Sequence, residues 1–394
     1  MTKRKLGIAI VGLGGAVGTT MVAGIELLKK GVIGKDGLPL AEVAADGLAA
    51  YEDIVFAGWD LYGEHLASAA ETHDVLTYKQ HVAVEEDLRK TKPWPAVGNP
   101  KFVSNITGQN ALAGNSHRET IESLRENLRE FKGDCDAVVV INLASTEKLA
   151  ADGNEILNSL ADFEKALDDN SSDISPAMLY AYAAIGEGVP FGNFTPSVAA
   201  DIPALIELAN KNKVPIAGKD GKTGQTFIKS VIAPALRSRA LKVQGWFSTN
   251  ILGNRDGLVL SNEDSLASKV KTKSSLLDDI LGYEVQDHIV DIRYYRPRGD
   301  NKEAWDNIDV TGFLGQPMQL KINFLCRDSV LAAPLAIEIA RCLDLANQRG
   351  EGGIQEQLSV FFKLPMAKGE KLEQAFHRQE DVLLNWLGHK KMTP

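Results

Sequence analysis

Hydrophobic residues in the first half of the chain form short continuous runs separated by amphipathic stretches. The runs cover residues 6–11, 54–59, 136–142 and 214–218. Such runs are typical of strands buried on both faces of a parallel sheet. The stretches 19–30, 117–131, 152–167, 175–185 and 202–211 have helical character. This alternation predicts an α/β fold with a Rossmann-like, doubly wound parallel sheet.

The pattern changes after residue 241. Residues 242–249, 288–296 and 318–326 alternate between apolar and polar, which is typical of strands in a one-sided, antiparallel or mixed sheet. A long apolar helix is predicted for 329–347, behind the N-cap pair Asp328-Ser329, and an amphipathic helix for 370–387. We predict one Rossmann-like domain of residues 1–241 and 329–394. A second α+β domain, residues 242–328, is inserted before the C-terminal helices. The insertion 31–52 and the segments 78–114 and 189–197 are expected to be loops.

A glycine-rich loop lies between the first predicted strand and the first predicted helix. Its glycines are Gly12, Gly14, Gly15 and Gly18. In this context glycines let the backbone approach a pyrophosphate at the helix N-terminus. The spacing departs from the standard motif, because Val17 stands where the third glycine is usual. The acid Asp60, at the end of the second predicted strand, is of the type that binds the adenosine ribose and favours NAD. The alternatives are a tight turn without a ligand and an aspartate that caps a helix.

Composition narrows the choice of partners. The net charge is −9 and the pI is about 5.4, which argues against nucleic acid or an anionic membrane as the main partner but leaves room for a locally basic pocket. The three cysteines are far apart and form no disulfide framework, as expected in the cytoplasm. No apolar run is long enough to span a membrane.

Several lysines stand in polar loops or interrupt apolar runs. Lys269, Lys271 and Lys273 alternate along one segment, and Lys302 and Lys363 lie further on. Lysines that converge on one pocket would bind a phosphate and would lower one another's pKa, as acid–base catalysis requires. The alternative is a solvated basic loop. Metal-ligand spacings, a Walker loop and a nucleophile elbow are absent from the sequence, and His288 is interpreted as structural.

Taken together, the ordered motifs resemble those of the myo-inositol-1-phosphate synthase (inositol-3-phosphate synthase) family. The resemblance covers most of the chain and is strongest between residues 218 and 334. Its pieces are residues 12–18 (GLGGAVG), 58–60 (GWD), 142–147 (NLASTE), 220–226 (DGKTGQT), 252–257 (LGNRDG), 268–275 (SKVKTKSS), 299–302 (GDNK) and 328–332 (DSVLA).

The resemblance implies an isomerase that converts D-glucose 6-phosphate into 1L-myo-inositol 1-phosphate. NAD oxidises C5, enolisation at C6 permits aldol closure onto C1, and NADH returns the hydride. The implied catalytic residues are Asp220, Lys269, Lys273, Lys302 and Lys363. The implied substrate-binding residues are Thr223, Gln225, Leu252, Asn254, Asp256 and Leu260. The implied cofactor-binding residues are Gly12, Gly14, Gly15, Ala16, Val17, Asp60, Asn142, Ala144, Ser145, Asp300, Asp328 and Ser329.

The sequence also departs from the family pattern. The long forms carry asparagines where this chain has Ala16 and Val17, so it is expected to be a short, prokaryotic-type member. A homotetramer is expected, with its interfaces in the second domain, and a divalent or monovalent cation is a further candidate cofactor. Lys271 is expected to be solvated; in an extended segment it would share a face with Lys269 and Lys273, so this expectation requires a local turn or helix.

Two other functions remain open. One is an NAD-dependent dehydrogenase of a phosphorylated polyol that releases NADH. The other is a non-catalytic dinucleotide sensor. Both leave the lysine loops unexplained.

Overall fold

The structure is a computed structural model that describes residues 4–104, 107–148, 154–253, 276–369 and 373–388. The chain forms two compact units. Unit 1 comprises Met1–Gly221 and Ala333–Lys368, and unit 2 comprises Lys222–Ala332 and Gly369–Pro394. These limits differ from the domain ranges expected from the sequence, because the helix that follows Gly224 and the C-terminal helix group with unit 2.

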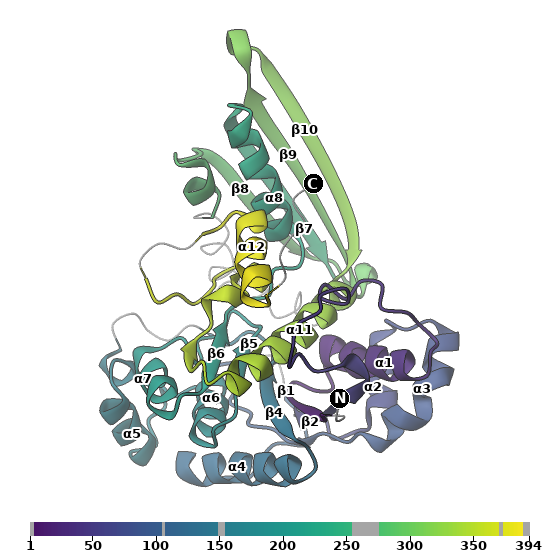
Figure 1. Cartoon of the computed structure of the whole chain (residues 1–394), viewed down its shortest axis with the longest axis vertical. Helices are drawn as coiled ribbons and strands as arrows, with labels where there is room; N and C mark the ends of the chain where they lie inside the picture. The colour runs from purple at the N-terminus through teal and green to yellow at the C-terminus, as the bar shows by residue number, and fades with distance from the viewer. Residues whose placement is uncertain (1–3, 105–106, 149–153, 254–275, 370–372, 389–394) are drawn as a thin grey trace. The chain divides into compact units, whose positions relative to one another are not determined.

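The described residues of unit 1 form a seven-stranded sheet (Figure 1). Its strand order is β11-β6-β5-β4-β1-β2-β3, and every pairing is parallel. The strands are β1 (Leu6–Val11), β2 (Ile54–Asp60), β3 (Trp94–Pro95), β4 (Ala137–Asn142), β5 (Phe191–Asn193), β6 (Pro215–Gly218) and β11 (Gly353–Ile354). The predicted doubly wound sheet is confirmed. The strand order reverses between β1 and β4, which is where ligands bind in such folds.

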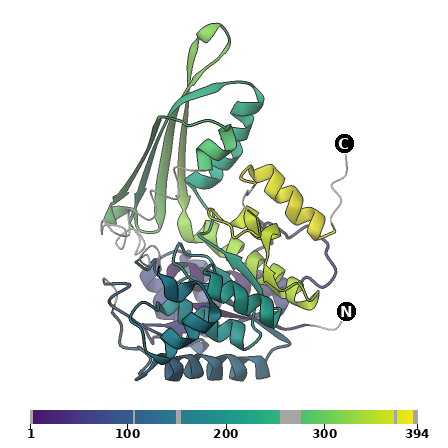
Figure 2. The same cartoon turned by 90° about the vertical axis from the view of Figure 1, so that its left-hand side faces the viewer.

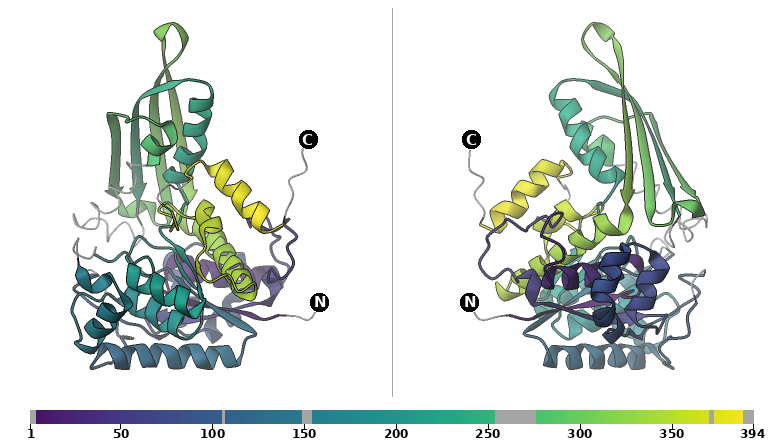
Figure 3. Two further views of the ribbon diagram at one scale, coloured as in Figure 1. Left: turned by 60° about the vertical axis from the view of Figure 1, so that its left-hand side comes forward. Right: turned by 90° about the vertical axis from the view of Figure 1, so that its right-hand side faces the viewer.

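Helices pack on both faces of this sheet. They are α1 (Ala16–Lys29), α2 (Leu66–His73), α3 (Tyr78–Lys90), α4 (His117–Gly133), α5 (Leu160–Asp168), α6 (Pro176–Gly186), α7 (Pro203–Asn212) and most of α11 (Asp328–Gln348). Helices α4 to α7 lie together on one face of the sheet (Figure 3). Their apolar side chains share a core with Val138 and Val140. On the opposite face, α11 approaches β5 so closely that a Cβ at Gly192 would lie 3.1 Å from Ile339 and Leu343.

Three local predictions for unit 1 were wrong. Helix α3 lies in a segment expected to be a loop and begins with a capping box formed by Thr77 and Gln80. The predicted helix 152–167 is shorter, because Ser159 caps α5 by accepting the N–H of Asp162 at 3.1 Å. Strand β5 lies within the predicted loop 189–197. Short 3₁₀ segments complete the unit: Tyr51–Asp53, Glu155–Leu157 and Glu356–Phe361.

Unit 2 contains a four-stranded sheet of order β10-β9-β7-β8 (Figure 2). Its strands are β7 (Lys242–Leu252), β8 (Asp287–Tyr294), β9 (Asn301–Thr311) and β10 (Pro317–Arg327). The pair β7–β8 is parallel and the other pairs are antiparallel, which confirms a mixed sheet. Strand β9 was not predicted, because the buried Asp306 interrupts its apolar alternation. That carboxylate accepts Trp246 Nε1–H at 2.7 Å and the Ser248 hydroxyl at 2.6 Å.

Helices cover one face of the unit 2 sheet; on the other, called the open face, described side chains such as Ile289 and Leu325 are exposed. Helix α8 (Gln225–Ser238) and the helical residues 276–281 pack on Trp246, Ile308 and Val310. Helix α12 (Phe376–Trp386) contacts α8, with the rings of Phe227 and Phe376 5.1 Å apart. These contacts explain why α8 and α12 belong to this unit. The 3₁₀ segments Arg296–Arg298 and Phe313–Gly315 lie in its turns.

Candidate active site

The glycine loop of unit 1 has the backbone geometry that a dinucleotide site needs. Gly12 has a φ of 87°, which favours glycine. A Cβ at Gly18 would lie 2.6 Å from the Leu13 carbonyl oxygen. No side chain caps the N-terminus of α1 at Gly15, and its first turn has no acid. The N–H groups and the helix dipole can therefore stabilise an anion there.

Asp60 lies at the end of β2, directly beside this loop. Its Oδ2 accepts the N–H of Gly14 at 2.8 Å, and its Oδ1 accepts the N–H of Tyr62 at 3.0 Å. Helix α2 is capped by His65 rather than by Asp60. The carboxylate is thus oriented by the backbone next to the glycines, where an acid can bind a ribose.

The loop after β4 meets the glycine loop. A Cβ at Gly12 would lie 3.1 Å from the backbone of Ala144, and the Leu143 N–H donates to the Val11 carbonyl at 2.9 Å. Asn142 orients this loop, because its Oδ1 accepts the N–H of Ala144 at 3.1 Å. The structure therefore brings together the predicted cofactor residues of unit 1. They are Gly12, Gly14, Gly15, Ala16, Val17, Asp60, Asn142, Ala144 and Ser145.

Asp220 and Lys363 form a second cluster in unit 1. Lys363 Nζ donates to Asp220 Oδ1 at 2.7 Å, although the two residues are 143 positions apart. Both side chains are largely buried, with exposed fractions of 12% for Lys363 and 6% for Asp220. The backbone also joins them: the Lys363 N–H donates to the Asp220 carbonyl at 2.7 Å, and Lys219 and Leu364 exchange two hydrogen bonds. Such a pair can hold a proton at a defined place.

Unit 2 gathers three more of the predicted residues at the start of α8. Asp328 Oδ1 lies 3.3 Å from Lys302 Nζ and accepts the Thr223 hydroxyl at 3.4 Å. A Cβ at Gly224 would lie 3.8 Å from Lys302 Nζ. Gly224 is the N-cap of α8, and no side chain of the described residues caps this helix. A cation and a helix N-terminus together form a place that favours an anion.

Gln225 and Leu252 are both 2% exposed in unit 2. Gln225 Nε2 donates to the Thr249 carbonyl at 3.2 Å, and its Oε1 accepts from Asn250 Nδ2. Asn250 was not among the predicted site residues. The only sequence signal for it was its place two positions before the predicted site residue Leu252. These contacts fix the first turn of α8 against β7.

Asp300 and Ser329 hold the start of α11. Ser329 Oγ donates to Asp300 Oδ1 at 2.6 Å, and the Asp328 N–H donates to the Asp300 carbonyl at 3.1 Å. Burial raises the pKa of Asp300, and the hydrogen bond from Ser329 opposes that rise. The helix begins at Asp328, one residue earlier than predicted, and Asp300 accepts the N–H groups of Asp328 and Ser329.

The remaining predicted residues lie outside the described part of the chain. They are Asn254, Asp256, Leu260, Lys269 and Lys273, together with Lys271. Their roles, and the contrast between Lys271 and its neighbours, stay predictions.

Two buried lysines of unit 2 escaped the sequence analysis. Lys222 is 3% exposed, and its Nζ lies 2.5 Å from Gln379 Oε1; burial lowers its pKa to about 7. Lys229 is 2% exposed, with its Nζ 2.6 Å from His288 Nε2. Burial lowers the pKa of Lys229 to about 8, against the attraction of Asp306.

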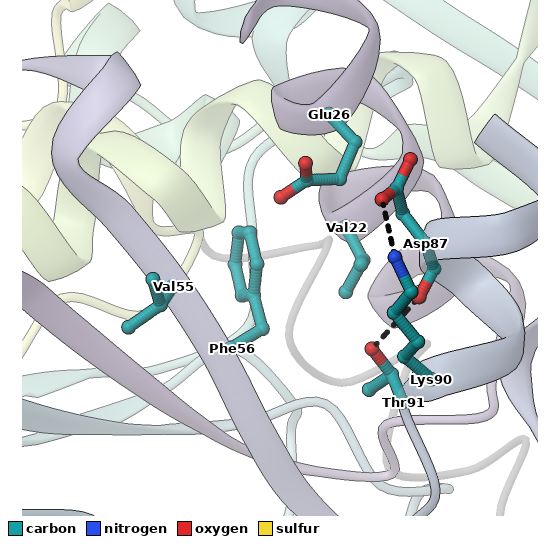
Figure 4. A pocket seen from close by; sticks show the side chains of 7 residues that line it. All are labelled: Val22, Glu26, Val55, Phe56, Asp87, Lys90 and Thr91. Carbon is teal, nitrogen blue, oxygen red and sulfur yellow. Dashed lines mark hydrogen bonds and ion pairs between the residues drawn. The ribbon is translucent and has the colours of Figure 1, made fainter. Parts of the chain in front are cut away.

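A pocket of about 220 Å³ opens elsewhere in unit 1, between α1, β2 and α3 (Figure 4). It is lined by Val22, Glu26, Val55, Phe56, Asp87, Lys90 and Thr91. None of these was predicted to be functional. Its carboxylates are paired with lysines: Glu26 with Lys29 at 2.8 Å and Asp87 with Lys30 at 2.6 Å. Lys90 of the lining also contacts Asp87, at 3.6 Å, so both carboxylates of the pocket are already engaged by lysines.

The described residues contain neither a metal-binding cluster nor a membrane-spanning helix. No three or more His, Cys, Asp or Glu side chains there are grouped so that they could hold a metal ion. No helix of that part of the chain is both long and apolar enough to cross a membrane.

Comparisons with known proteins agree with this geometry. The family model described as myo-inositol-1-phosphate synthase matches residues 36–388, so the match begins after the glycine loop. Inositol-3-phosphate synthase 1 of Bacteroides thetaiotaomicron is 41% identical, over 98% of this chain and 96% of the relative. The rice protein of the same name is 31% identical, over 88% of this chain and 76% of the relative.

Solved structures give the same result. The inositol-3-phosphate synthase of Caenorhabditis elegans superposes with a TM-score of 0.90 at 26% identity, covering 98% of this chain and 86% of that chain. A myo-inositol-1-phosphate synthase-related protein of Thermotoga maritima superposes with a TM-score of 0.82 at 26% identity, covering 99% of this chain and 100% of that chain.

Proposed function

Because the chain belongs to the myo-inositol-1-phosphate synthase family, we propose that it converts D-glucose 6-phosphate into 1L-myo-inositol 1-phosphate. In this reaction C5 is oxidised, C6 is enolised, C6 closes onto C1, and the C5 ketone is reduced again. The observation that carries the proposal is the Asp220–Lys363 pair, held beside the carboxyl ends of the strands of a dinucleotide-binding sheet.

The residues around β1 and β4 fit NAD. The positive φ of Gly12, the lack of space for a Cβ at Gly18 and the uncapped N-terminus of α1 support a pyrophosphate there. Asp60 would bind the adenosine ribose, and the backbone of Ala144 and Ser145 would border the nicotinamide half. NAD, when bound, supplies the capacity to accept a hydride and to return it.

The start of α8 is the proposed phosphate site of unit 2. Thr223, the N–H groups that follow Gly224, and the Lys302 ammonium offer hydrogen bonds and positive charge. Asp328 holds Lys302 before the substrate binds and shares it afterwards. Lys269, Lys273, Asn254, Asp256, Leu252 and Leu260 are proposed to complete the substrate contacts. Asp300 and Ser329 are proposed to fix the backbone at Asp328, and a role of these three residues in cofactor binding stays a prediction from the family resemblance.

Proton transfer is assigned to lysines and Asp220. Oxidation of an alcohol releases its hydroxyl proton, and enolisation removes one from C6. The buried Lys363 ammonium can stabilise the negative charge that develops on oxygen, because its position is fixed in advance by Asp220. Asp220 can in turn take up a proton when Lys363 turns towards the substrate.

One assay separates this function from its alternatives. The protein is incubated with D-glucose 6-phosphate and catalytic NAD, while inositol phosphate and absorbance at 340 nm are followed. Inositol phosphate without net NADH is expected. Stoichiometric NADH would indicate a dehydrogenase, and NAD binding without turnover of any sugar phosphate would indicate a sensor.

Variants test the residues. Lys363→Ala and Lys302→Ala should each lower kcat by at least roughly 10²-fold, with an unchanged circular dichroism spectrum. Lys101→Ala is the control, because Lys101 pairs with Asp173 at the surface of unit 1. Equal activity in all three variants would contradict the assignment.

We also propose that the open face of the unit 2 sheet joins copies of the chain in a homotetramer. Strand register places Ile289, Phe247, Trp305 and Leu325 on one face. Ile289, Trp305 and Leu325 are 50%, 39% and 60% exposed. Exposed apolar side chains gathered on one surface support an interface. Light scattering after size exclusion should give four copies for the wild type and fewer for Trp305→Glu; a monomeric wild type would refute the interface.

All three cysteines are unpaired, which supports the expected cytoplasmic location.

The need for a cation is a separate question. The described His, Cys, Asp and Glu side chains form no group that could hold a metal ion, so no step of the proposed reaction is assigned to a cation. A requirement for a divalent or monovalent cation is tested by dialysis against EDTA, followed by assays with Mg²⁺, K⁺, NH₄⁺ or Na⁺ added back.

A further inference from the structure

A chain of buried polar side chains lies beneath the carboxyl ends of β4, β5 and β6 in unit 1. Asn142, Asn193 and Ser197 are each 1% exposed, and Thr195 is 6% exposed. The segment 193–197, read NFTPS, supplies three of these four residues. Buried polar groups are retained only where each finds a partner, so their mutual contacts define what this segment does.

One branch of the network leads to the loop proposed to hold the cofactor. Asn193 Oδ1 accepts from Asn142 Nδ2 at 3.1 Å, and Asn142 Oδ1 accepts the Ala144 N–H at 3.1 Å. Asn193 Nδ2 donates to the Ser197 carbonyl at 2.7 Å, and Ser197 Oγ accepts the Glu147 N–H at 3.0 Å. Asn193 is therefore connected to both ends of the β4 loop.

The other branch leads to Asp220. Asn193 Oδ1 also accepts the N–H and the hydroxyl of Thr195, at 3.2 Å and 3.0 Å. The Thr195 carbonyl accepts the Asp220 N–H at 3.0 Å. The neighbouring Phe194 carbonyl accepts the Gly221 N–H at 2.9 Å, and a Cβ at Gly221 would lie only 2.0 Å from the Phe194 ring. The segment thus fixes the backbone that carries Asp220.

We propose that Asn193 is a positioning residue of the reaction, which holds the Asp220–Lys363 pair in register with the cofactor-side loop at Ala144. The proposal rests on the proposed function. Asparagine suits the position because one oxygen accepts three hydrogen bonds while the amide nitrogen donates a fourth. An aspartate lacks the donor, and an alanine removes the acceptor that Asn142 and Thr195 share in a buried site, leaving Asn142 Nδ2 only its longer contact to Thr195 Oγ1 at 3.5 Å.

This role differs from one in general stability. Neither Asn193 nor Thr195 touches the reacting atoms; each acts through the loops it joins. A shift of about 1 Å between reacting groups can cost roughly 10²-fold in rate. Loss of the hydrogen bonds through Asn193 should therefore lower kcat, because the loop after β4 and the segment that carries Asp220 would no longer be held in register. The affinity for NAD should change less than kcat, because the glycine loop proposed to hold the pyrophosphate makes no contact with Asn193 in this network.

The test compares kcat, KM, the Kd for NAD and the melting temperature of five proteins. These are the wild type, Asn193→Ala, Thr195→Val, Thr195→Ser and the control Asn127→Ala. Asn127 Oδ1 accepts Trp59 Nε1–H at 2.9 Å, so its substitution removes a partly buried hydrogen bond of unit 1 outside the network. Thr195→Val is nearly isosteric but lacks the hydroxyl, and Thr195→Ser restores it.

Asn193→Ala and Thr195→Val are expected to lower kcat by roughly 10- to 100-fold. The Kd for NAD should stay within about threefold of the wild type. Thr195→Ser and Asn127→Ala should keep near-wild-type kcat. If Asn193→Ala does not fold, the contrast between valine and serine at position 195 decides. A kcat unchanged in Asn193→Ala and Thr195→Val, or lowered equally in Thr195→Ser, would overturn the inference. A wild type without synthase activity would refute the proposed function instead.

Discussion

Glu147 offers a quantitative prediction, because it is a carboxyl group buried in the loop after β4. It is 5% exposed, its Oε1 accepts the Ala177 N–H at 2.9 Å, and its own N–H binds Ser197. Burial raises the pKa of Glu147 from 4.5 to about 7, and the hydrogen bonds from Ser175 and Ala177 only partly offset that rise. The substitution Glu147→Gln keeps the shape of the side chain and removes its titration.

The sign of the effect follows from the protons bound in each state. Between pH 4.5 and about 7 the unfolded chain has lost the proton of Glu147, whereas the folded chain keeps it. Stability from this group is complete below pH 4.5 and is lost as the pH rises to about 7. The rise of the pKa from 4.5 to about 7 corresponds to about 3 kcal/mol, at ~1.4 kcal/mol per unit. Glu147→Gln should recover most of this at neutral pH.

The assay is the melting temperature of NAD-free protein between pH 5 and pH 8. Glu147→Gln should melt roughly 3–6 °C above the wild type at pH 8, and the two should converge towards pH 5. Glu130→Gln, on the exposed side of α4, is the control and should follow the wild-type profile. A constant difference between Glu147→Gln and the wild type across this range would refute the reasoning, since a packing effect does not titrate.

Three further predictions concern other sites. Gly18→Ala should raise the Kd for NAD at least roughly tenfold, because its Cβ would meet backbone, whereas Gly24→Ala in the same helix has open space and should not; equal affinities in a titration would contradict this. Lys222→Met should raise the free energy of unfolding by about 1–3 kcal/mol at pH 7.5, measured by urea unfolding. It should also flatten the rise in stability that the wild type shows between pH 7 and pH 10. That rise exists because the pKa of Lys222 is lowered from 10.5 to about 7, so the folded chain sheds its proton first; a steeper rise would be inconsistent with this. Asp306→Ala should cost about 2–4 kcal/mol in the same assay, as the buried Trp246 Nε1–H loses its acceptor, and a loss below about 0.5 kcal/mol would count against it.

The parts of the fold that the sequence predicted are those where one local signal dominates. Strands β1 and β4 are nearly continuous apolar runs. The glycines between β1 and α1 are recognisable from their spacing, because a strand–loop–helix turn of this kind leaves no room for side chains. Helix α3 was missed because its surroundings are rich in proline and glycine and only two of its side chains, Val84 and Leu88, are buried. Strand β9 was missed because Asp306 replaces an apolar residue on its buried face and is satisfied by β7.

The candidate site was less predictable from physical chemistry alone. The pairing of Asp220 with Lys363 depends on chain segments 143 residues apart. The family resemblance implied that both residues are catalytic, but it did not predict that they pair. The buried connection through Asn193 gave no signal, because asparagine in a glycine- and proline-containing segment is typical of an ordinary loop. Long-range partners of polar residues are determined by the complete fold.

The backbone bonds that join residues 218–220 to residues 363–366 have a consequence for how such an enzyme can diverge. Gly218, Lys219 and Asp220 bond to Met366, Leu364 and Lys363 through main-chain atoms. Main-chain hydrogen bonds therefore hold the two α-carbons of the proposed catalytic pair. The φ of 59° at Asp220 favours asparagine or glycine as replacements there, whereas position 363 has no such restriction, so we expect the proton-transferring group to diverge first at position 363.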